Sequence, residues 1–326
     1  MKRIFVLCIM ISLFLTACNE NEPLESDLFA MDTMMNVRIW GDEETLSKAC
    51  DIIRNLDRLL DAQNANSDIS KLNQDGFLSV SKDTAVLLEL AVQYSEQTDG
   101  CFDPTVYPAV LAWKEAKTAP PTEAELQTIL PQIGTEHISL DGRNISLSNG
   151  AMLDLGGIAK GYAAQMCIEY LKKSNVETAI ISLGGNVQTL GSKPDGSKWS
   201  VGIADPANPS ASIAVVRFEG SLALVTSGSY QRYYELCGVK FHHILDPKTL
   251  YPAENELSSV TILAQNGTMA DAYSTALFVM GLDDAIEFWR SQSDFEAVFV
   301  LNDGTILATD GAAPLLTDCG FTEIKR

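Results

Sequence analysis

The sequence is poor in positive charge, and this shortage narrows the kinds of partner it can have. It contains 23 Lys and Arg residues against 43 Asp and Glu residues, a formal net charge of −20. A surface of this sign repels nucleic acid and anionic lipid headgroups. It also repels an anionic ligand, unless a metal ion or a nearby lysine reverses the local field. We therefore expect no nucleic-acid partner.

Cysteine is present, but the spacing of a zinc site is missing. The chain has seven cysteines and no C-x-x-C pair, which argues against structural zinc. Cys8 and Cys18 fall near the N-terminus. The remaining cysteines are odd in number, so any disulfides among them leave a free thiol. We expect single buried thiols at these positions, which are Cys50, Cys101, Cys167, Cys237 and Cys319.

Long hydrophobic runs are also absent, since a bilayer span needs about 20 apolar residues. The apolar run 4–15 is shorter, follows two basic residues and stops just before Cys18. This pattern predicts a secretory signal over residues 1–17, and the cysteine after small residues resembles a lipobox. We then expect Cys18 to be lipidated and residues 18–27 to form a tether. The protein would be anchored to the cell membrane, facing the periplasm or the extracellular side. The alternative is an ordinary signal peptide that contains an incidental cysteine.

The segment LDLGGIAKGYAAQ, residues 153–165, resembles a phosphate-holding loop followed by a helix. It matches neither common nucleotide loop. A P-loop has Gly-Lys followed by Ser or Thr, and a Rossmann turn reads G-x-G-x-x-G. Here Lys160 precedes Gly161, and Asp154 stands just before the glycine pair. The loop therefore indicates phosphate chemistry of another kind, with a carboxylate beside it.

Helical and strand patterns follow one another along residues 28–326 without a repeat or a clear linker, which predicts one domain. Hairpin signals mixed with amphipathic helices predict an α+β fold, with mixed, largely antiparallel sheets and flanking helices. We expect helices at 43–60, at 83–97 with Ser81 as its cap, after the capping box of Thr122 and Glu125, from the glycine loop to about 173, at 269–281 and at 283–289. We expect strands at 28–40, 138–140, 144–147, 258–264, 296–301 and 305–308, and several more between 178 and 225.

Three other stretches contain residues that suit a binding site. In GCFDPTVYPAVLAW, Asp103-Pro104 favours a turn, and the prolines fix a loop before an aromatic helix. The pair Gly184-Gly185 permits close approach to a ligand, although a tight turn is the simpler explanation. His243 precedes Ile-Leu-Asp-Pro at the edge of a strand, a better place for chemistry than that of an isolated core histidine.

Asp271 and Thr275 are four residues apart in a predicted helix, so they share one face. A carboxylate and a hydroxyl are hard oxygen donors of the type that Mg²⁺ accepts. The alternative is that Asp271 is favoured near a helix N-terminus by the helix dipole, with Thr275 incidental. The spacing alone leaves both explanations open.

The ordered set of these motifs resembles the ApbE family of flavin transferases, over about residues 28–308. The resemblance rests on MDTMMNV, SDISKLN, FDPTVYPAVLAW, LDLGGIAKGYAAQ, SLGGNVQTLG, WSVGIADP, VTSGSYQRYY, HHILDP and ADAYSTAL. It implies an ApbE-like fold that binds FAD and Mg²⁺. It also implies transfer of FMN to a Ser or Thr hydroxyl of an acceptor flavoprotein, with release of AMP.

The resemblance also implies roles for particular residues. The metal ligands fall on Gly157, through its carbonyl, and on Asp271 and Thr275. Mg²⁺ and Lys160 would neutralise the charge that grows on the breaking phosphoanhydride, and His243 would accept the proton of the attacking hydroxyl. The expected FAD contacts are Met31, Gln63, Cys101, Phe102, Asp103, Asp154, Lys160 and Leu245.

Two departures from the family pattern affect the expected chemistry. Asp32 stands where the family usually has Gly. Gln63, about four residues before Ser67, stands where many family transferases have an aromatic residue. A missing ring leaves room for water, which would make the chain an FAD pyrophosphatase that gives FMN and AMP. The alternatives to transfer are therefore hydrolysis at the same site, or flavin binding by a lipoprotein without turnover.

Overall fold

The computed structural model describes residues 22–116, 119–236 and 238–326. The predicted signal, Cys18 and the first part of the predicted tether lie outside these residues. The large sheet is antiparallel except where its last two strands pair, so the expected α+β fold with largely antiparallel sheets is confirmed. Its strands, in spatial order, are β1 (Leu24–Ala30), β2 (Thr33–Ile39), β6 (Ala179–Leu183), β7 (Asn186–Leu190), β10 (Ala223–Gly228), β13 (Leu257–Ala264), β14 (Phe295–Leu301), β15 (Ile306–Thr309) and β17 (Thr322–Ile324).

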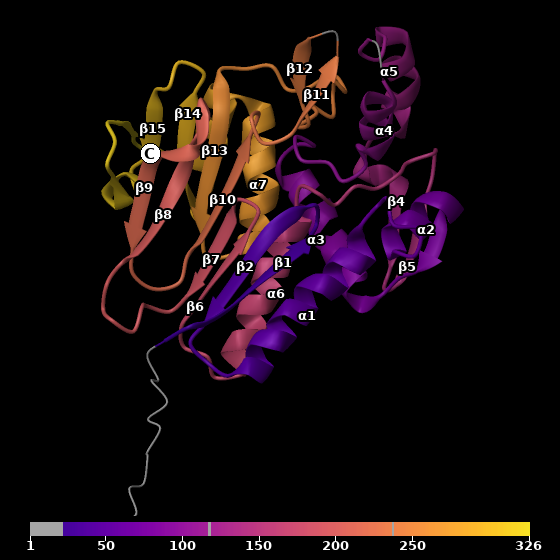
Figure 1. Ribbon diagram of the computed structural model, residues 1–326. Coiled ribbons are helices and arrows are strands. Elements are labelled where there is room, and N and C mark those ends of the chain that lie inside the picture. Colours follow the sequence, from indigo (N-terminus) through magenta and orange to yellow (C-terminus); the bar gives the residue numbers. More distant parts are fainter. Residues whose placement is uncertain (1–21, 117–118, 237) are drawn as a thin grey trace, which may run out of the picture.

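One face of this sheet is covered by helices (Figure 1). They are α1 (Glu43–Leu60), α3 (Lys82–Gln97), α6 (Ala159–Lys173), α7 (Gly267–Met280) and α8 (Leu282–Ser291). Helix α1 has the predicted bounds because Asp42 caps its first turn and its apolar face is buried. Ser81 caps α3, as expected, by accepting a hydrogen bond from the Thr84 N–H.

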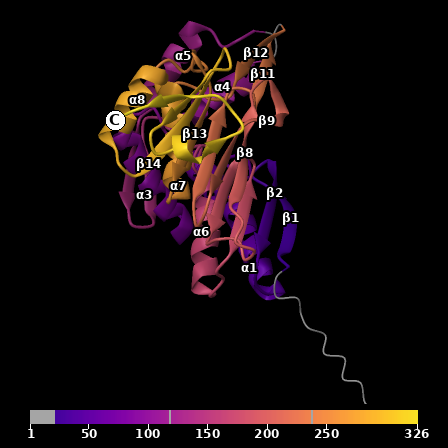
Figure 2. The ribbon, with the colours of Figure 1, turned by 90° about the vertical axis from the view of Figure 1, so that its left-hand side faces the viewer.

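The opposite face is covered in part by a three-stranded sheet of β16 (Leu316–Thr317), β9 (Asn208–Phe218) and β8 (Trp199–Asp205) (Figures 1 and 2). Trp199 and Val216 of the small sheet share a core with Leu263 and Val298 of the large one. Strands β13 and β14 are therefore buried on both faces, and this explains their nearly continuous apolar sequences.

The N-terminal strand differs from the prediction in two ways. The single strand expected at 28–40 is a hairpin of β1 and β2, which turns at Met31 and Asp32. The predicted tether also extends too far, because Leu24–Asp27 already belong to β1. These residues look like a tether because their charged side chains face outward. On that face Glu25 pairs with Arg38 of β2.

A third group of elements lies at one end of the large sheet, near the tip of this hairpin (Figure 1). Trp113 is buried there, donates to the Leu250 carbonyl at 2.8 Å and packs on Phe241.

The capping box of Thr122 and Glu125 and the hairpin around Gly142 are confirmed. Helix α2 and the β11–β12 hairpin were not predicted. The elements are α2 (Asp68–Asp75), α4 (Tyr107–Glu115), α5 (Glu123–Ile129), β3 (Phe77–Ser79), β4 (Ile138–Asp141), β5 (Asn144–Leu147), β11 (Tyr233–Leu236) and β12 (Val239–His242).

Cys50 and Cys167 are buried single thiols, as expected, whereas Cys101 and Cys319 are only partly buried. Cys237 lies outside the described residues. In the part of the chain that the structure describes, no helix combines the length and the apolar character that a membrane span requires.

Candidate active site

Hydrogen bonds with two other segments hold the backbone of the glycine loop in place. Asn73 of α2 binds Leu153 twice, accepting from its N–H at 2.6 Å and donating to its carbonyl at 2.9 Å. The Asp154 N–H donates to the Pro104 carbonyl at 2.8 Å, which fixes the loop against the predicted Asp103-Pro104 turn. Asp154 accepts from the Gly156 N–H at 2.7 Å, so one of its carboxylate oxygens stabilises the turn within the loop.

Helices α6 and α7 cross at very short distance where the loop ends. Gly161 allows this approach: a Cβ built on it would lie 2.2 Å from the Gly267 carbonyl oxygen and 2.6 Å from the Asp271 Cβ. The Gly161 N–H donates to Asp271 Oδ2 at 2.7 Å. A bond from the first turn of one helix thus orients the carboxylate of the other.

The three expected metal ligands lie together. Asp271 is buried, and Thr275 follows one turn later on the same face of α7. Thr275 Oγ1 is 3.2 Å from the Ser227 hydroxyl on β10, and a Cβ built on Gly157 would be 3.5 Å from the same oxygen. The glycine loop therefore lies directly against the helix face that carries the oxygen donors.

The donor set suits Mg²⁺ better than a transition metal. No cluster of three or more His, Cys, Asp or Glu side chains that could hold a metal occurs among the described residues. Mg²⁺ does not need one, because it is commonly bound by one or two carboxylates together with water and substrate phosphate. Asp271 Oδ1, the Thr275 hydroxyl and the loop backbone are hard oxygen donors of this kind.

The local electrostatics also suit a cation. Burial raises the pKa of Asp271, and the Lys160 ammonium and the Gly161 N–H oppose this shift. Burial likewise raises the pKa of Asp154, against the Gly156 N–H and Lys160. Lys160 donates to the Gly156 carbonyl at 3.3 Å. Two desolvated carboxylates thus share one lysine, and a bound cation would favour their ionised forms.

Of the expected FAD contacts in the segment 101–103, Phe102 lies against the glycine loop. A Cβ on Gly157 would be 3.2 Å from its ring. Asp103 accepts from the N–H and the hydroxyl of Thr105, at 2.7 and 2.6 Å, so its Oδ1 stabilises the turn. Burial raises the pKa of both Asp103 and the Cys101 thiol.

His243 lies just after β12, with its ring partly buried. Its Nδ1 is 3.1 Å from the Arg232 carbonyl oxygen. A carbonyl can only accept a hydrogen bond, so Nδ1 carries the proton and Nε2 remains an acceptor. Burial lowers the pKa of His243 to about 4, opposed by the Arg232 carbonyl and aided by the positive charges of Lys160 and Arg232. The neighbouring Leu245 is buried in the core around Trp113.

Met31 and Gln63 lie at two turns. The Met31 N–H donates to Asp57 of α1 at 2.7 Å. Gln63 is exposed in the turn after α1, where its amide oxygen accepts from Lys114. Tyr107 lies beside this turn, with its hydroxyl 3.4 Å from the Ala62 carbonyl. An aromatic ring is thus near the Gln63 turn, although Gln63 itself contributes none.

The sequence did not single out several side chains that organise this site. Asn73 and Arg232 lie in the motifs SDISKLN and VTSGSYQRYY, and Ser227 shares the second of these. Nothing in their local pattern marks them, because their partners are far away along the chain. The sequence pattern at Gly161 shows only that it follows Lys160.

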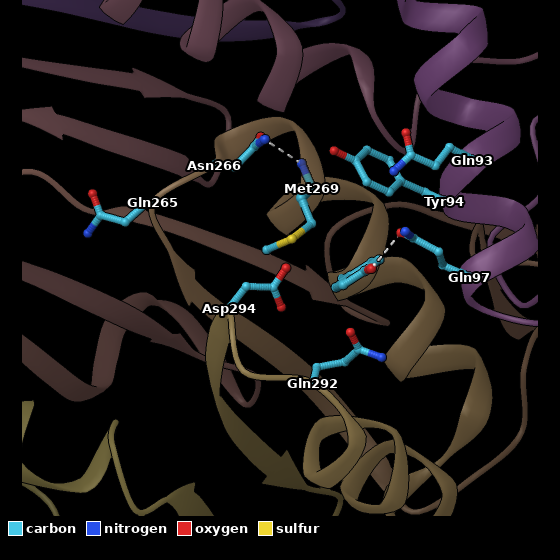
Figure 3. A pocket seen from close by; sticks show the side chains of 9 residues that line it. Gln93, Tyr94, Gln97, Gln265, Asn266, Met269, Gln292 and Asp294 are labelled. Atoms are coloured by element: carbon cyan, nitrogen blue, oxygen red, sulfur yellow. Dashed lines mark hydrogen bonds between the residues drawn. The ribbon is translucent and has the colours of Figure 1, made fainter.

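The cavity drawn in Figure 3 is separate from these residues. It has a volume of about 260 Å³ and is lined by amides of α3 and of the segments around α7, including Gln93, Gln97 and Asn266. Met269 of α7 points into it (Figure 3), and the amide of Asn266 accepts from the Met269 N–H at 3.1 Å. Asp271 instead faces α6. The cavity therefore lies on a different side of α7 from the oxygen donors.

Comparison with known proteins identifies the family of the chain. The profile described as the ApbE family matches residues 31–299. The FAD:protein FMN transferase of Klebsiella pneumoniae is 33% identical to the chain, over 89% of this chain and 92% of that protein.

Solved structures are similar over nearly the same extent. The crystal structure of the ApbE protein of Thermotoga maritima superposes with a TM-score of 0.83 at 29% identity, and covers 90% of this chain and 99% of that one. The apo form of the Pseudomonas stutzeri flavinyl transferase ApbE gives a TM-score of 0.79 at 26% identity, over 90% and 96% of the two chains. Because the family profile covers well over half of the sequence, the chain is a member of the ApbE family.

Proposed function

We propose that the chain transfers FMN from FAD to a Ser or Thr hydroxyl of an acceptor flavoprotein and releases AMP. The observation that carries this proposal is the buried Asp271, oriented by Gly161 at the mouth of a glycine loop, in a chain of the ApbE family. In the reaction the acceptor oxygen forms a bond to the phosphorus of the FMN half. The bond from that phosphorus to the bridging oxygen breaks, and AMP leaves with the bridging oxygen.

The metal in this proposal is Mg²⁺, held by Asp271, Thr275 and the Gly157 carbonyl. When bound, Mg²⁺ would neutralise the charge that develops on the pyrophosphate oxygens. Lys160 supplies a second positive charge next to the loop, and it lies near enough to influence both Asp154 and Asp271. Local positive charge of this kind allows a strongly acidic chain to bind an anionic substrate.

His243 is the proton acceptor in the proposed reaction. Its protonated Nδ1 faces a carbonyl, which leaves Nε2 as the acceptor for the hydroxyl proton. The pKa of about 4 keeps the free enzyme's imidazole neutral at physiological pH. Bound phosphate is anionic and would raise this pKa, which makes the imidazole a stronger base in the complex.

The proposal also places the protein on the outer face of the cell membrane, anchored by lipid at Cys18. It is supported by the apolar leader, by the cysteine that follows small residues, and by the start of β1 at Leu24, which leaves only a short connection to the anchor. The acceptor flavoprotein would then have to present its hydroxyl on the same side of the membrane.

Incubation of the purified chain with FAD and Mg²⁺, with and without an acceptor flavoprotein, tests the function. We expect AMP and a covalently flavinylated acceptor to form together, and little AMP without acceptor. Release of AMP that does not depend on the acceptor would instead establish hydrolysis. FAD binding without any AMP would leave the chain as a flavin-binding lipoprotein and would refute catalysis.

Hydrolysis of FAD to FMN and AMP is the second candidate, and the exposure of Gln63 favours it. No ring at this position shields the flavin side of the site from water. We predict that Gln63→Tyr lowers acceptor-independent AMP release more than it lowers FMN transfer. Stacking of a ring adds only about 0.5–1.5 kcal/mol beyond the burial of its area, so the change should appear in the product ratio more than in FAD affinity.

Gln63→Leu is the matched control, because it removes the hydrogen bond with Lys114 without adding a ring. If the Tyr variant keeps the wild-type ratio of hydrolysis to transfer, Gln63 does not control water access. Tyr107, beside the Gln63 turn, and Tyr230, in the motif VTSGSYQRYY, would then be the next aromatic residues to test.

A further inference from the structure

The turn between β1 and β2 is strained, and a distant arginine holds it. Met31 and Asp32 have φ values of 48° and 57°, in the left-handed region that is strained for non-glycine residues. Such strain persists where surrounding contacts determine the conformation. Here Arg232 Nη2 donates to the carbonyl oxygens of Met31 at 3.3 Å and of Asp32 at 3.2 Å, across about 200 residues of sequence.

The main chain of Arg232 contacts His243. Its carbonyl accepts from the His243 N–H at 3.2 Å and from the His243 Nδ1–H at 3.1 Å. The exposed side chain of Arg232 thus binds the β1–β2 turn, while its carbonyl binds the histidine. One residue connects the turn that carries Met31 with the imidazole that is the proposed base.

The preceding histidine, His242, is bound by a different carbonyl. His242 has its Nε2 3.0 Å from the Ala253 carbonyl oxygen, so its proton must lie on Nε2. His243 has the opposite tautomer, with the proton on Nδ1. Two adjacent histidines are therefore held in opposite tautomers by two different carbonyls, and His243 is the one with an unprotonated Nε2.

The β11–β12 hairpin, which precedes His243, depends on contacts with other parts of the chain. Strands β11 and β12 pair with each other and with no other strand of the described residues. A two-stranded hairpin alone is marginally stable in water. Packing of Phe241 on Trp113 fixes the hairpin on one side, and the hydrogen bonds of Arg232 fix the residue just before β11.

We propose that Arg232 is a positioning residue for His243: its guanidinium, bound to the Met31 and Asp32 carbonyls, keeps its own carbonyl where it selects the Nδ1–H tautomer. This inference rests on the proposed role of His243 as proton acceptor. The Asp32 carboxylate contributes little to the arrangement, since it lies 4.0 Å from Arg232 in an exposed pair. The contact depends on backbone carbonyls, which any residue at position 32 supplies.

The test combines steady-state kinetics with ¹⁵N NMR of the imidazole rings in the purified chain. The chain has only three histidines, so selective labelling and single-histidine variants assign the signals. At neutral pH the wild type should show His243 as the Nδ1–H tautomer and His242 as Nε2–H. Arg232→Ala should mix the tautomers of His243, leave His242 unchanged, and lower kcat for FMN transfer about 5- to 30-fold, the loss expected for one or two hydrogen bonds. The KM for FAD should change less than kcat, although the released turn carries Met31.

Two variants separate positioning from general damage. Arg232→Lys keeps a cation that can reach a carbonyl, so it should restore part of kcat and of the tautomer preference. Asp32→Gly should keep both, because glycine accepts the positive φ and the carbonyl remains. An Arg232→Ala variant with pure Nδ1–H His243 overturns the inference, whatever its kcat. If His243→Gln keeps wild-type transfer, the proposed base itself fails, a result that is independent of the Arg232 tautomer measurement.

Discussion

Gly161→Ala should damage the site through the packing of α6 on α7. The new Cβ would lie 2.2 Å from the Gly267 carbonyl oxygen and 2.6 Å from the Asp271 Cβ. Both atoms belong to the first turns of α7 and are not the ends of flexible side chains, so the helices must separate by about 1 Å. Overpacking of this kind typically costs about 1–3 kcal/mol.

Two further terms decide the sign of the net change in stability. Separation weakens the bond from the Gly161 N–H to Asp271 Oδ2, and hydrogen bonds to charged groups contribute about 1.5–3 kcal/mol. Alanine is a better helix former than glycine, which returns about 1 kcal/mol. The unfavourable terms win, so we expect net destabilisation of about 1.5–5 kcal/mol. With an unfolding entropy of about 2.1 cal/mol/K per residue, a domain of about 300 residues loses roughly 1.6 °C in Tm for each kcal/mol.

FMN transfer should fall more than the stability loss explains. The helices that separate carry Asp271, and a misplacement of about 1 Å at a catalytic site can cost roughly 100-fold in rate. Circular dichroism gives the Tm of each variant. AMP release at 25 °C then gives the rate of a variant that is still folded. Gly320→Ala is the control, because a Cβ there meets nothing within 4 Å. Wild-type Tm and activity in Gly161→Ala would show that the close approach of α6 and α7 is not required.

Three further predictions address the metal, the base and the anchor. Asp271→Ala should abolish AMP release from FAD, and a variant with wild-type turnover would refute the metal assignment. Because burial and the positive charges of Lys160 and Arg232 lower the pKa of His243 to about 4, the base is neutral above that pH. In an NMR titration of the imidazole rings, His243 should therefore titrate near pH 4, and a midpoint near 6.5 would contradict the lowered pKa. Cys18→Ser should move the protein from the membrane to the soluble fraction or leave it unprocessed, whereas normal processing with unchanged membrane retention would exclude lipidation.

Elements with strong local signals could be predicted from the sequence. Helix α1 has apolar residues at helical spacing, and its N-cap lies where the pattern begins. The capping box of α5 joins residues only three apart. These features depend on nearest neighbours along the chain, so no tertiary information is needed to find them.

The two hairpins near the site lack such signals. Two-residue hairpins with two positive φ values favour Asn-Gly, Asp-Gly or Gly-Gly, and Met31-Asp32 matches none of them. The β1–β2 hairpin was therefore predicted as one long strand. The exposed charges of β1 were assigned to the tether for a similar reason, because their partner Arg38 lies on the next strand.

The sequence predicts which residues belong to the site better than it predicts the contacts that bring them together. Helical spacing placed Asp271 and Thr275 on one face, as the structure has them. The contacts that orient the site join distant residues: 110 positions separate Gly161 from Asp271, and 80 separate Asn73 from Leu153. No local pattern encodes such pairs, because each depends on how whole helices and strands pack.

Asp32 shows how a departure in sequence can preserve a conformation. The resemblance to the ApbE family put the backbone near the expected flavin contact in question, because it implies Gly at this position. The structure places Asp32 at φ 57°, where glycine is unstrained and where Asp and Asn are the side chains most often tolerated. The carbonyl that Arg232 binds is present with either residue. The replacement therefore keeps the turn and its contact with Arg232, at a cost in backbone strain that Asp57 and Arg232 offset through three hydrogen bonds.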